Sequence, residues 1–302
     1  MFHLRVLAAA LLATNVLGLS PVGHTPTGQP IFRGPPGSTV VQSGRDMKVF
    51  TPNGTVIHVF EDVVRSQSKQ TPRWIPRQEL STTEAFVTLT TSDALAFQTF
   101  NVSFVVPPEP ATFESQIIYF STGLQLLDDT GEPQQSLVVA LQYGASVIDG
   151  GPFWTAVVLL QFLPSGGFFE SFDPNANPAV NAGDRLSITI RNYPNGPQFP
   201  DSPETYYFIA ALNNRPDILS FGVGWEMLPQ KVALGVSEEG AFQPSDYPRG
   251  SLVFEDVSVN FTTGFPAVTW NIEQNSGTDV SMKIDKDGSR NAQVSIVFPD
   301  DL

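Results

Sequence analysis

The sequence contains no cysteine and only three histidines among its 302 residues. Without cysteine no disulfide can form, so the fold must be held by its hydrophobic core. The histidines are His3, His24 and His58, all near the N-terminus. The remainder of the chain therefore has no histidine for a Ser-His-Asp triad or a zinc site. We expect no metal site and no cofactor.

Basic residues are also few, with 16 Lys and Arg against 30 Asp and Glu, for a formal net charge of -14. Such a surface repels phosphate groups, which argues against nucleic acid and against an anionic membrane as partners. Protonation of the carboxylates in acid would weaken the self-repulsion, so the composition suits an acidic medium. It equally suits a protein that uses surface charge for solubility. We expect a monomer.

No long hydrophobic run is present apart from the one that follows Arg5, from Val6 to Leu17. This run is shorter than the roughly 20 residues that span a bilayer, which disfavours a membrane anchor. A basic residue before a short apolar run predicts a signal peptide over residues 1–18, cleaved near Gly18. We therefore expect a secreted, extracellular protein.

Three N-x-S/T sequons agree with export and predict a glycoprotein, with glycans on Asn53, Asn101 and Asn260. Because sequons also arise by chance, they corroborate the signal peptide without proving it.

Apolar repeats at helical spacing with caps at both ends are also missing. From residue 85 onward the chain instead shows short runs rich in Val, Ile, Phe and Thr, divided by Gly, Pro, Asn and Asp. In one run Leu186, Ile188 and Ile190 alternate with polar residues, as in a strand with one buried face. Many such strands without intervening helices predict an all-β sandwich of two antiparallel sheets over residues 85–302.

Residues 19–84 are predicted to form an N-terminal extension that contains a hairpin and a linker. Residues 21–37 are rich in Pro and Gly and are expected to bury little. The Asn53-Gly54 pair suits a type I′ turn between two strands. Residues 65–83 are polar and basic, which indicates a linker or a propeptide junction. The hairpin could also pair with the main sheets.

Several segments taken in order resemble the fungal glutamic peptidases, the eqolisin family, over roughly residues 97–298. They are FQTFNVSFVVPPEP, IIYFSTGLQ, VVALQYGAS, FWTAVVLLQFLP, AGDRLSITI, PRGSLVFEDV and the final stretch from WNIEQ to VSIVF. The resemblance implies a secreted concanavalin A-like sandwich with a substrate groove on a concave face. It also implies acid endopeptidase activity by a Gln/Glu pair.

In that family a glutamate activates a water molecule while a glutamine amide stabilises the oxyanion. The glutamine corresponds to Gln142. The glutamate falls on Leu234, or on Ala233 with a one-residue slip, and neither can accept a proton. Glu238, four residues on, and Glu226 are the available replacements. The predicted catalytic residues are thus Gln142 with Glu238 or Glu226.

Strand alternation places Gln142 on the same face as Val138 and Ala140, where small neighbours would leave room for a ligand. A structural glutamine bonded to a neighbouring strand is the competing interpretation.

Three further residues are candidates for substrate binding. Trp154 and Trp225 could stack against sugar rings or polypeptide, although most such residues belong to the core. Gln161 stands at the position of a supporting glutamate of the family.

Two functions follow. The first is an eqolisin-like acid endopeptidase whose general base is displaced or lost. The second is a non-catalytic secreted β-sandwich that binds glycan or polypeptide in its groove. They differ in whether a glutamate carboxylate shares an open groove with the Gln142 amide.

Overall fold

The computed structural model describes residues 18–25, 28–64, 81–89, 96–114, 116–163, 167–171, 178–194, 196–197, 199, 204–213, 220–274 and 279–299. The predicted signal peptide and the predicted linker therefore lie largely outside the described residues. Within this part of the chain, no helix has the length and apolar character needed to cross a bilayer.

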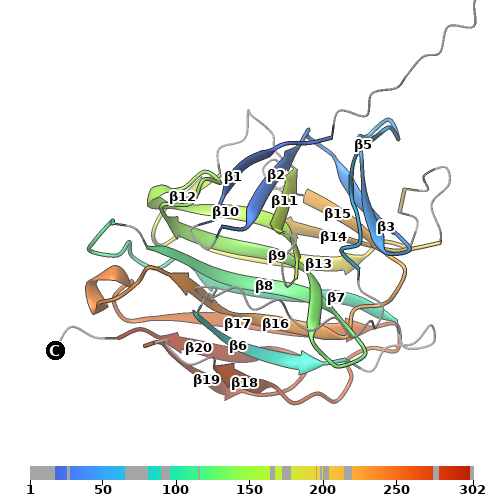
Figure 1. Cartoon of the computed structure of the whole chain (residues 1–302). Helices are drawn as coiled ribbons and strands as arrows, with labels where there is room; N and C mark the ends of the chain where they lie inside the picture. Colours follow the sequence, from blue (N-terminus) through green and yellow to red (C-terminus); the bar gives the residue numbers. More distant parts are fainter. Residues whose placement is uncertain are drawn as a thin grey trace, which may run out of the picture.

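The described residues form two ten-stranded sheets, which we name sheet A and sheet B (Figure 1). Across sheet A the order is β1 (Pro21–His24), β2 (Pro30–Gly34), β11 (Gly167–Ser171), β10 (Gly151–Phe162), β9 (Pro133–Gly144), β8 (Ile117–Leu127), β16 (Lys231–Glu239), β6 (Ser81–Thr88) and β18 (Asn271–Gln274), while β12 (Ala179–Val180) pairs with β10. Across sheet B the order is β19 (Ser281–Lys286), β20 (Ala292–Val297), β17 (Ser251–Phe261), β7 (Phe97–Val105), β13 (Arg185–Asn192), β14 (Tyr206–Leu212), β15 (Ser220–Trp225), β3 (Thr39–Ser43), β4 (Asp46–Phe50) and β5 (Val56–Phe60). A short 3₁₀ helix, Pro244–Asp246, precedes β17.

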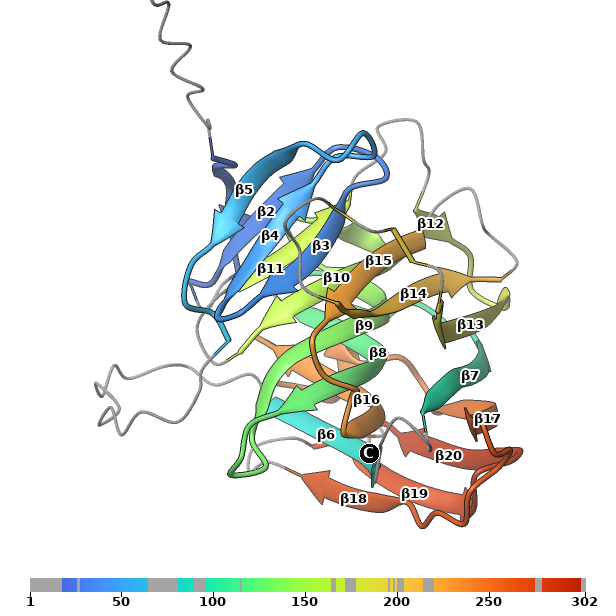
Figure 2. The same cartoon turned by 90° about the vertical axis from the view of Figure 1, so that its right-hand side faces the viewer.

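The two sheets pack face to face, with β8, β9 and β10 in one layer and β7, β13 and β14 in the other (Figure 2). Their facing sides form one large cluster that includes Phe104, Phe120, Leu141 and Phe208. Burial of this apolar area drives the fold at about 25 cal/mol per Å². The predicted all-β sandwich is confirmed.

Strand alternation decides which side chains enter this core. In β13, Leu186, Ile188 and Ile190 are buried between more exposed polar residues, as expected for a sheet with one solvated face. The same rule applied to sheet A separates its core face from an outer face, which carries the site described below.

The N-terminal segment belongs to both sheets, which the sequence left open. Strand β2 pairs in parallel with β11 of sheet A, and β3 pairs in parallel with β15 of sheet B. Each predicted antiparallel sheet therefore contains one parallel pair. The expectation that residues 21–37 bury little is wrong for β2, because Ile31 is only 1% exposed.

The predicted hairpin is present as β4 and β5, but its turn is not of type I′. Only Gly54 of the central pair has a positive φ, of 82°. Gly54 N–H donates to the Thr51 carbonyl, so the turn begins at Thr51 with Pro52 second. Proline fixes φ near −65°, which favours a type I turn and shifts the left-handed position to the glycine.

Candidate functional site

A groove of about 590 Å³ crosses the outer face of sheet A. Its floor is low because small residues face outward at its centre, namely Gly123 on β8 and Ala233 and Gly235 on β16. A Cβ at Gly235 would lie 2.3 Å from the Thr83 carbonyl oxygen, so only glycine fits there. Ligand pockets commonly measure about 300–1,000 Å³, which makes this groove large enough for a substantial ligand.

A row of polar side chains crosses one part of the groove. Lys231 pairs with Gln125, Gln125 with Ser136, and Ser136 with Gln161, so the row spans β16, β8, β9 and β10. Neighbouring strands lie about 4.8 Å apart, which sets the spacing of these side chains. Ser136 is 1% exposed, and its Oγ has no hydrogen-bond partner. The Gln125 Oε1 is likewise buried and unpartnered. Buried polar groups normally have partners, so both atoms offer unused bonding capacity inside the groove.

One ion pair lies at the end of this row. Lys231 Nζ contacts the Glu84 carboxylate of the neighbouring strand and stands 4.2 Å from the centre of the Phe86 ring. Glu84 pairs across the strands with Glu273 of β18, which is exposed. Lysine and ring attract through the ring's quadrupole, so Lys231 is held from two sides. Among the described lining residues, the groove thus carries one cation, Lys231, and several carboxylates.

Gln142 lies on the groove face of β9, beside Val138 and Ala140, as its alternation predicted. Its side chain is nevertheless 0% exposed. The amide nitrogen donates to the Ile148 carbonyl at 2.6 Å and to Thr155 Oγ1 at 3.3 Å. The amide oxygen is buried without a partner. The side chain is therefore enclosed by the residues that follow β9, and no part of it reaches the open groove.

The enclosing segment is the 145–150 loop between β9 and β10. Ile148 packs against Ile31 of β2, and Asp149 pairs with Arg33 of the same strand at 3.3 Å. Arg33 also contacts Glu170 of β11. Burial raises the pKa of Glu170 to about 7, although the Arg33 guanidinium opposes the rise. The N-terminal segment thus holds the loop over Gln142.

Glu238 faces the opposite side of sheet A. On β16 the outward residue opposite Tyr119 and Gln142 is Ser237, so its successor Glu238 points toward the core. Glu238 is 4% exposed, and burial raises its pKa to about 7. A hydrogen bond from Tyr247 acts against this rise, while the charge of Asp279 adds to it. Its Oε2 is buried without a partner.

Glu226 lies elsewhere again, after the end of β15 in sheet B. Its carboxylate accepts a hydrogen bond from the Gly44 N–H at 2.6 Å, and its own N–H donates to Gln42. The structure therefore does not bring Gln142 together with either predicted base. The physical reason is alternation for Glu238 and a different sheet for Glu226. A general base must lie within about 3 Å of its water, or reach it through one further water.

No family model matches the sequence, and no curated protein does so either. Among solved structures, scytalido-glutamic peptidase with a transition-state analog inhibitor is similar, with a TM-score of 0.45 and 11% identity over 73% of this chain and 99% of that one. The similarity is remote.

The predicted substrate-binding residues divide into two groups. Gln161 lines the groove. Trp154 and Trp225 are both 0% exposed and belong to the core between the sheets. Trp225 donates its indole N–H to Gln135 Oε1 at 2.8 Å, and the Trp154 ring lies tilted against the Phe120 ring with their centres 5.5 Å apart. Neither ring presents a face to a ligand, because alternation turns both away from the groove.

The three sequons lie in different surroundings. Asn53 is exposed in the turn between β4 and β5. Asn101 lies on β7 and accepts a hydrogen bond from Thr189 at 2.7 Å. Asn260 lies on β17, with its side-chain oxygen buried. A glycan at Asn53 would meet the least obstruction.

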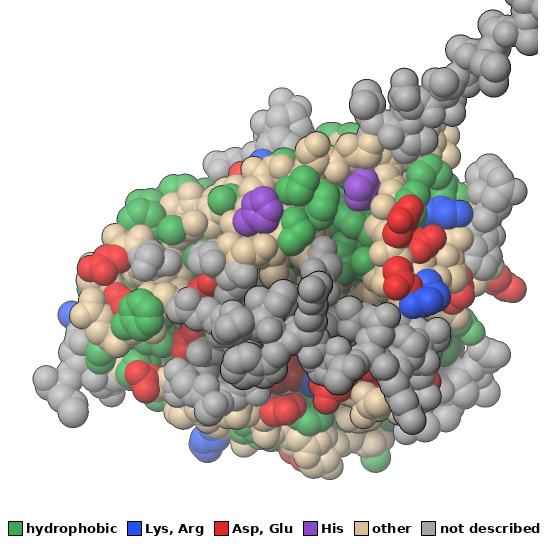
Figure 3. All heavy atoms as spheres, viewed as in Figure 1, with side chains coloured by type: hydrophobic (Ala, Val, Ile, Leu, Met, Phe, Trp, Pro, Cys, Tyr) green, Lys and Arg blue, Asp and Glu red, His purple; other side chains and the backbone are tan. Residues whose placement is uncertain are grey.

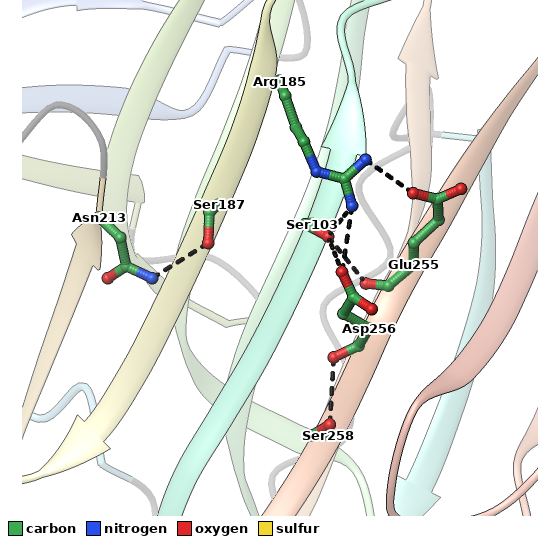
Figure 4. A network of polar contacts seen from close by, with 7 residues as sticks. All are labelled: Ser103, Arg185, Ser187, Asn213, Glu255, Asp256 and Ser258. Carbon is green, nitrogen blue, oxygen red and sulfur yellow. Dashed lines mark hydrogen bonds and ion pairs between the residues drawn. The ribbon is translucent and has the colours of Figure 1, made fainter.

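A second polar cluster lies on sheet B, outside the groove (Figure 4). Arg185 donates to Glu255 at 2.8 Å, to Asp256 at 3.0 Å and to Ser103 at 2.8 Å. Asp256 sits in a β-bulge of β17 with a φ of 54°. These groups satisfy one another and are largely exposed, so the cluster supports the bulge.

The groove residues Lys231, Gln125, Ser136 and Glu84 were not identified from the sequence. A signal was available in β8, where Ser121, Gly123 and Gln125 occupy every second position, with Thr122 and Leu124 between them. Small and polar residues at every second position indicate an outer face without a cover, but register across strands is needed to join them.

Proposed function

We propose that the protein is a non-catalytic binding protein that holds an extended polypeptide in the groove of sheet A. The observation that carries this proposal is that Gln142 and Glu238 point to opposite faces of the sheet. The groove is partly enclosed, and its described lining carries hydroxyl, amide and carboxylate groups. Such groups suit the repeating N–H and C=O of an extended chain.

The lining favours polypeptide over glycan. Sugar recognition commonly uses an aromatic face for stacking. Phe86 is the aromatic residue in the described lining, and Lys231 stands over its ring. Both candidate tryptophans are buried in the core.

The test uses Ser121, which is half-buried on the groove floor. Binding of a fluorescein-labelled, chemically unfolded protein is measured by fluorescence anisotropy with wild type, Ser121→Trp and Ser251→Trp. Ser251 is exposed on β17, outside the groove, and serves as the matched control. We expect Ser121→Trp to weaken binding at least tenfold and Ser251→Trp to leave it unchanged, with both variants folded by circular dichroism. Equal binding by all three proteins would refute the proposal that the polypeptide binds in the groove.

Hydrolysis of the same substrate is followed at about pH 3 to 4, where an ordinary carboxylate is partly ionised. We expect no cleavage. Cleavage by wild type that disappears in Gln142→Ala or Glu238→Gln would overturn the non-catalytic proposal and restore the predicted pair.

We further propose that the protein is secreted after loss of residues 1–18 and is glycosylated. The sequons at Asn53, Asn101 and Asn260 support this. Treatment of the secreted protein with an N-glycosidase is expected to lower its mass. Material whose mass stays unchanged and that remains inside the cell would contradict the proposal.

A further inference from the structure

The described lining of the groove carries more negative than positive charge. Its lining includes Glu84, Glu132 and Glu273 against Lys231 as the cation. Lys231 is already engaged by Glu84. Glu132 and Glu273 are both exposed. Figure 3 shows described acidic side chains around the rim of this face, with Lys and Arg side chains beside some of them. Low-dielectric walls lined by one sign of charge attract ligands of the opposite sign.

A second observation points to a ligand that donates hydrogen bonds. The Gln125 Oε1 is an acceptor that is buried on the groove floor without a partner. Ser136, 1% exposed, directs an equally unpartnered hydroxyl into the same space. A buried acceptor without a partner is unfavourable, and a ligand that donates a hydrogen bond to it would remove this cost.

We propose that the polypeptide bound in this groove is cationic and is selected through its lysine or arginine side chains. An ammonium or guanidinium group near Glu84 and Glu273 would pair with their carboxylates. A second such group of the same polypeptide, about 13 Å farther along the strands, would donate to the Gln125–Ser136 part of the row. Guanidinium offers five donors in a planar fork, which matches several acceptors on one floor. The inference rests on the proposed polypeptide-binding function and specifies its ligand.

The experiment compares two fluorescein-labelled peptides of equal length, one alternating Arg with Ser and one alternating Glu with Ser. Dissociation constants are measured by anisotropy at pH 7.5 with the full chain at low and moderate salt. We expect the arginine peptide to bind at least tenfold more tightly than the glutamate peptide. Added salt should weaken the binding of the arginine peptide, because salt screens the attraction between exposed charges.

Three variants locate the charge effect. Glu273→Gln should weaken the binding of the arginine peptide at least threefold. Glu61→Gln removes an exposed carboxylate outside the groove and should leave the affinity unchanged. Lys231→Gln frees Glu84 from its ion pair and should therefore make the arginine peptide bind more tightly. General damage to the fold would have the opposite effect.

The outcomes separate the two proposals. If both peptides bind equally, or the glutamate peptide binds more tightly, the cationic selection is refuted while the polypeptide groove stands. If the arginine peptide binds but Glu273→Gln matches Glu61→Gln, the selection does not reside in this groove and the inference fails. If neither peptide binds, the proposed function fails and the inference fails with it.

Discussion

At the scale of single residues, Trp225 shows how a candidate ligand contact proves to be a core group. Its ring is 0% exposed, and its indole N–H bonds to Gln135. A tryptophan at a plausible position in the sequence does not by itself reveal which face of the strand it occupies. In the structure, Trp225 stabilises the core and does not contact the groove.

Trp225→Phe is expected to lower the free energy of unfolding by about 2–3 kcal/mol. Part of the loss comes from the volume left empty, and part from the Gln135 oxygen left without a donor. Urea unfolding monitored by circular dichroism measures the difference. A variant as stable as wild type would contradict the buried position of the ring.

Gln142 illustrates what alternation can and cannot predict. The face of β9 on which it lies was predicted from the sequence, because side chains alternate strictly along a strand. Its enclosure was not, since that depends on the path of the 145–150 loop and on Arg33, more than one hundred residues away. Glu238 does not partner Gln142, because it directly follows Ser237, whose side chain faces the groove. Side chains alternate along a strand, so Glu238 points to the opposite face.

At the scale of elements, β2 and the 145–150 loop act together. Arg33 bridges Asp149 of the loop and Glu170 of β11. Ile31 and Ile148 add an apolar contact beside this bridge. The loop therefore depends on a strand from the other end of the chain.

Arg33→Gln is expected to loosen the loop and to increase amide hydrogen exchange over residues 145–150 at least tenfold relative to wild type. The removal of one partner from a largely buried ion pair leaves Glu170 without its cation. Exchange is measured by mass spectrometry of peptides from the intact protein. Arg45→Gln is the matched control, because Arg45 pairs with Asp62 at the exposed end of the β4–β5 hairpin. Unchanged exchange in Arg33→Gln would show that the loop is held by other contacts.

The bulge of β17 provides a second element with its own support. Arg185 joins Glu255 and Asp256, but its side chain is half exposed (Figure 4). Exposed ion pairs contribute about 0–1 kcal/mol.

We expect Arg185→Ala to lower the free energy of unfolding by less than about 1 kcal/mol, with a smaller effect in high salt. Chemical denaturation at two salt concentrations measures both quantities. A loss above about 2 kcal/mol would indicate that the cluster does more than support the bulge.

The sandwich was predictable from the number and spacing of its strands, and the β4–β5 hairpin from its turn residues. The joining of β2 and β3 to opposite sheets was not predictable, because parallel pairing between distant segments leaves no local sequence pattern. The polar row was missed for the same reason, since its members come from four strands.

At the scale of the whole molecule, two buried carboxyl groups make stability depend on pH. The pKa of Glu170 and that of Glu238 are each raised from 4.5 to about 7, chiefly by burial. Between these values the folded state binds more protons than the unfolded state. Folding is then favoured at low pH, and the free energy of unfolding falls as pH rises through this window.

Ionisation of the two groups as pH rises from about 4.5 to about 7.5 should lower the free energy of unfolding by several kcal/mol, since one unit of pKa corresponds to 1.36 kcal/mol. Urea unfolding across this range measures the slope. Glu238→Gln, which cannot ionise, should reduce the slope and be more stable than wild type at pH 7.5. Glu61→Gln, at an exposed position, is expected to keep the wild-type slope. A wild-type stability that rises over this range would contradict the assignment.

The crossing of the N-terminal segment from β2 in sheet A to β3 in sheet B has a consequence for biogenesis. A ribosome makes these strands first, yet their partners emerge much later, with Arg33 and Glu170 separated by 137 positions. Strands β2 and β3 have local neighbours in β1 and β4, but their other edges stay unpaired until β11 and β15 have been synthesised. Such distant pairings slow folding and leave unpaired edges open to association. The nascent chain should therefore need chaperone protection until translation is nearly complete.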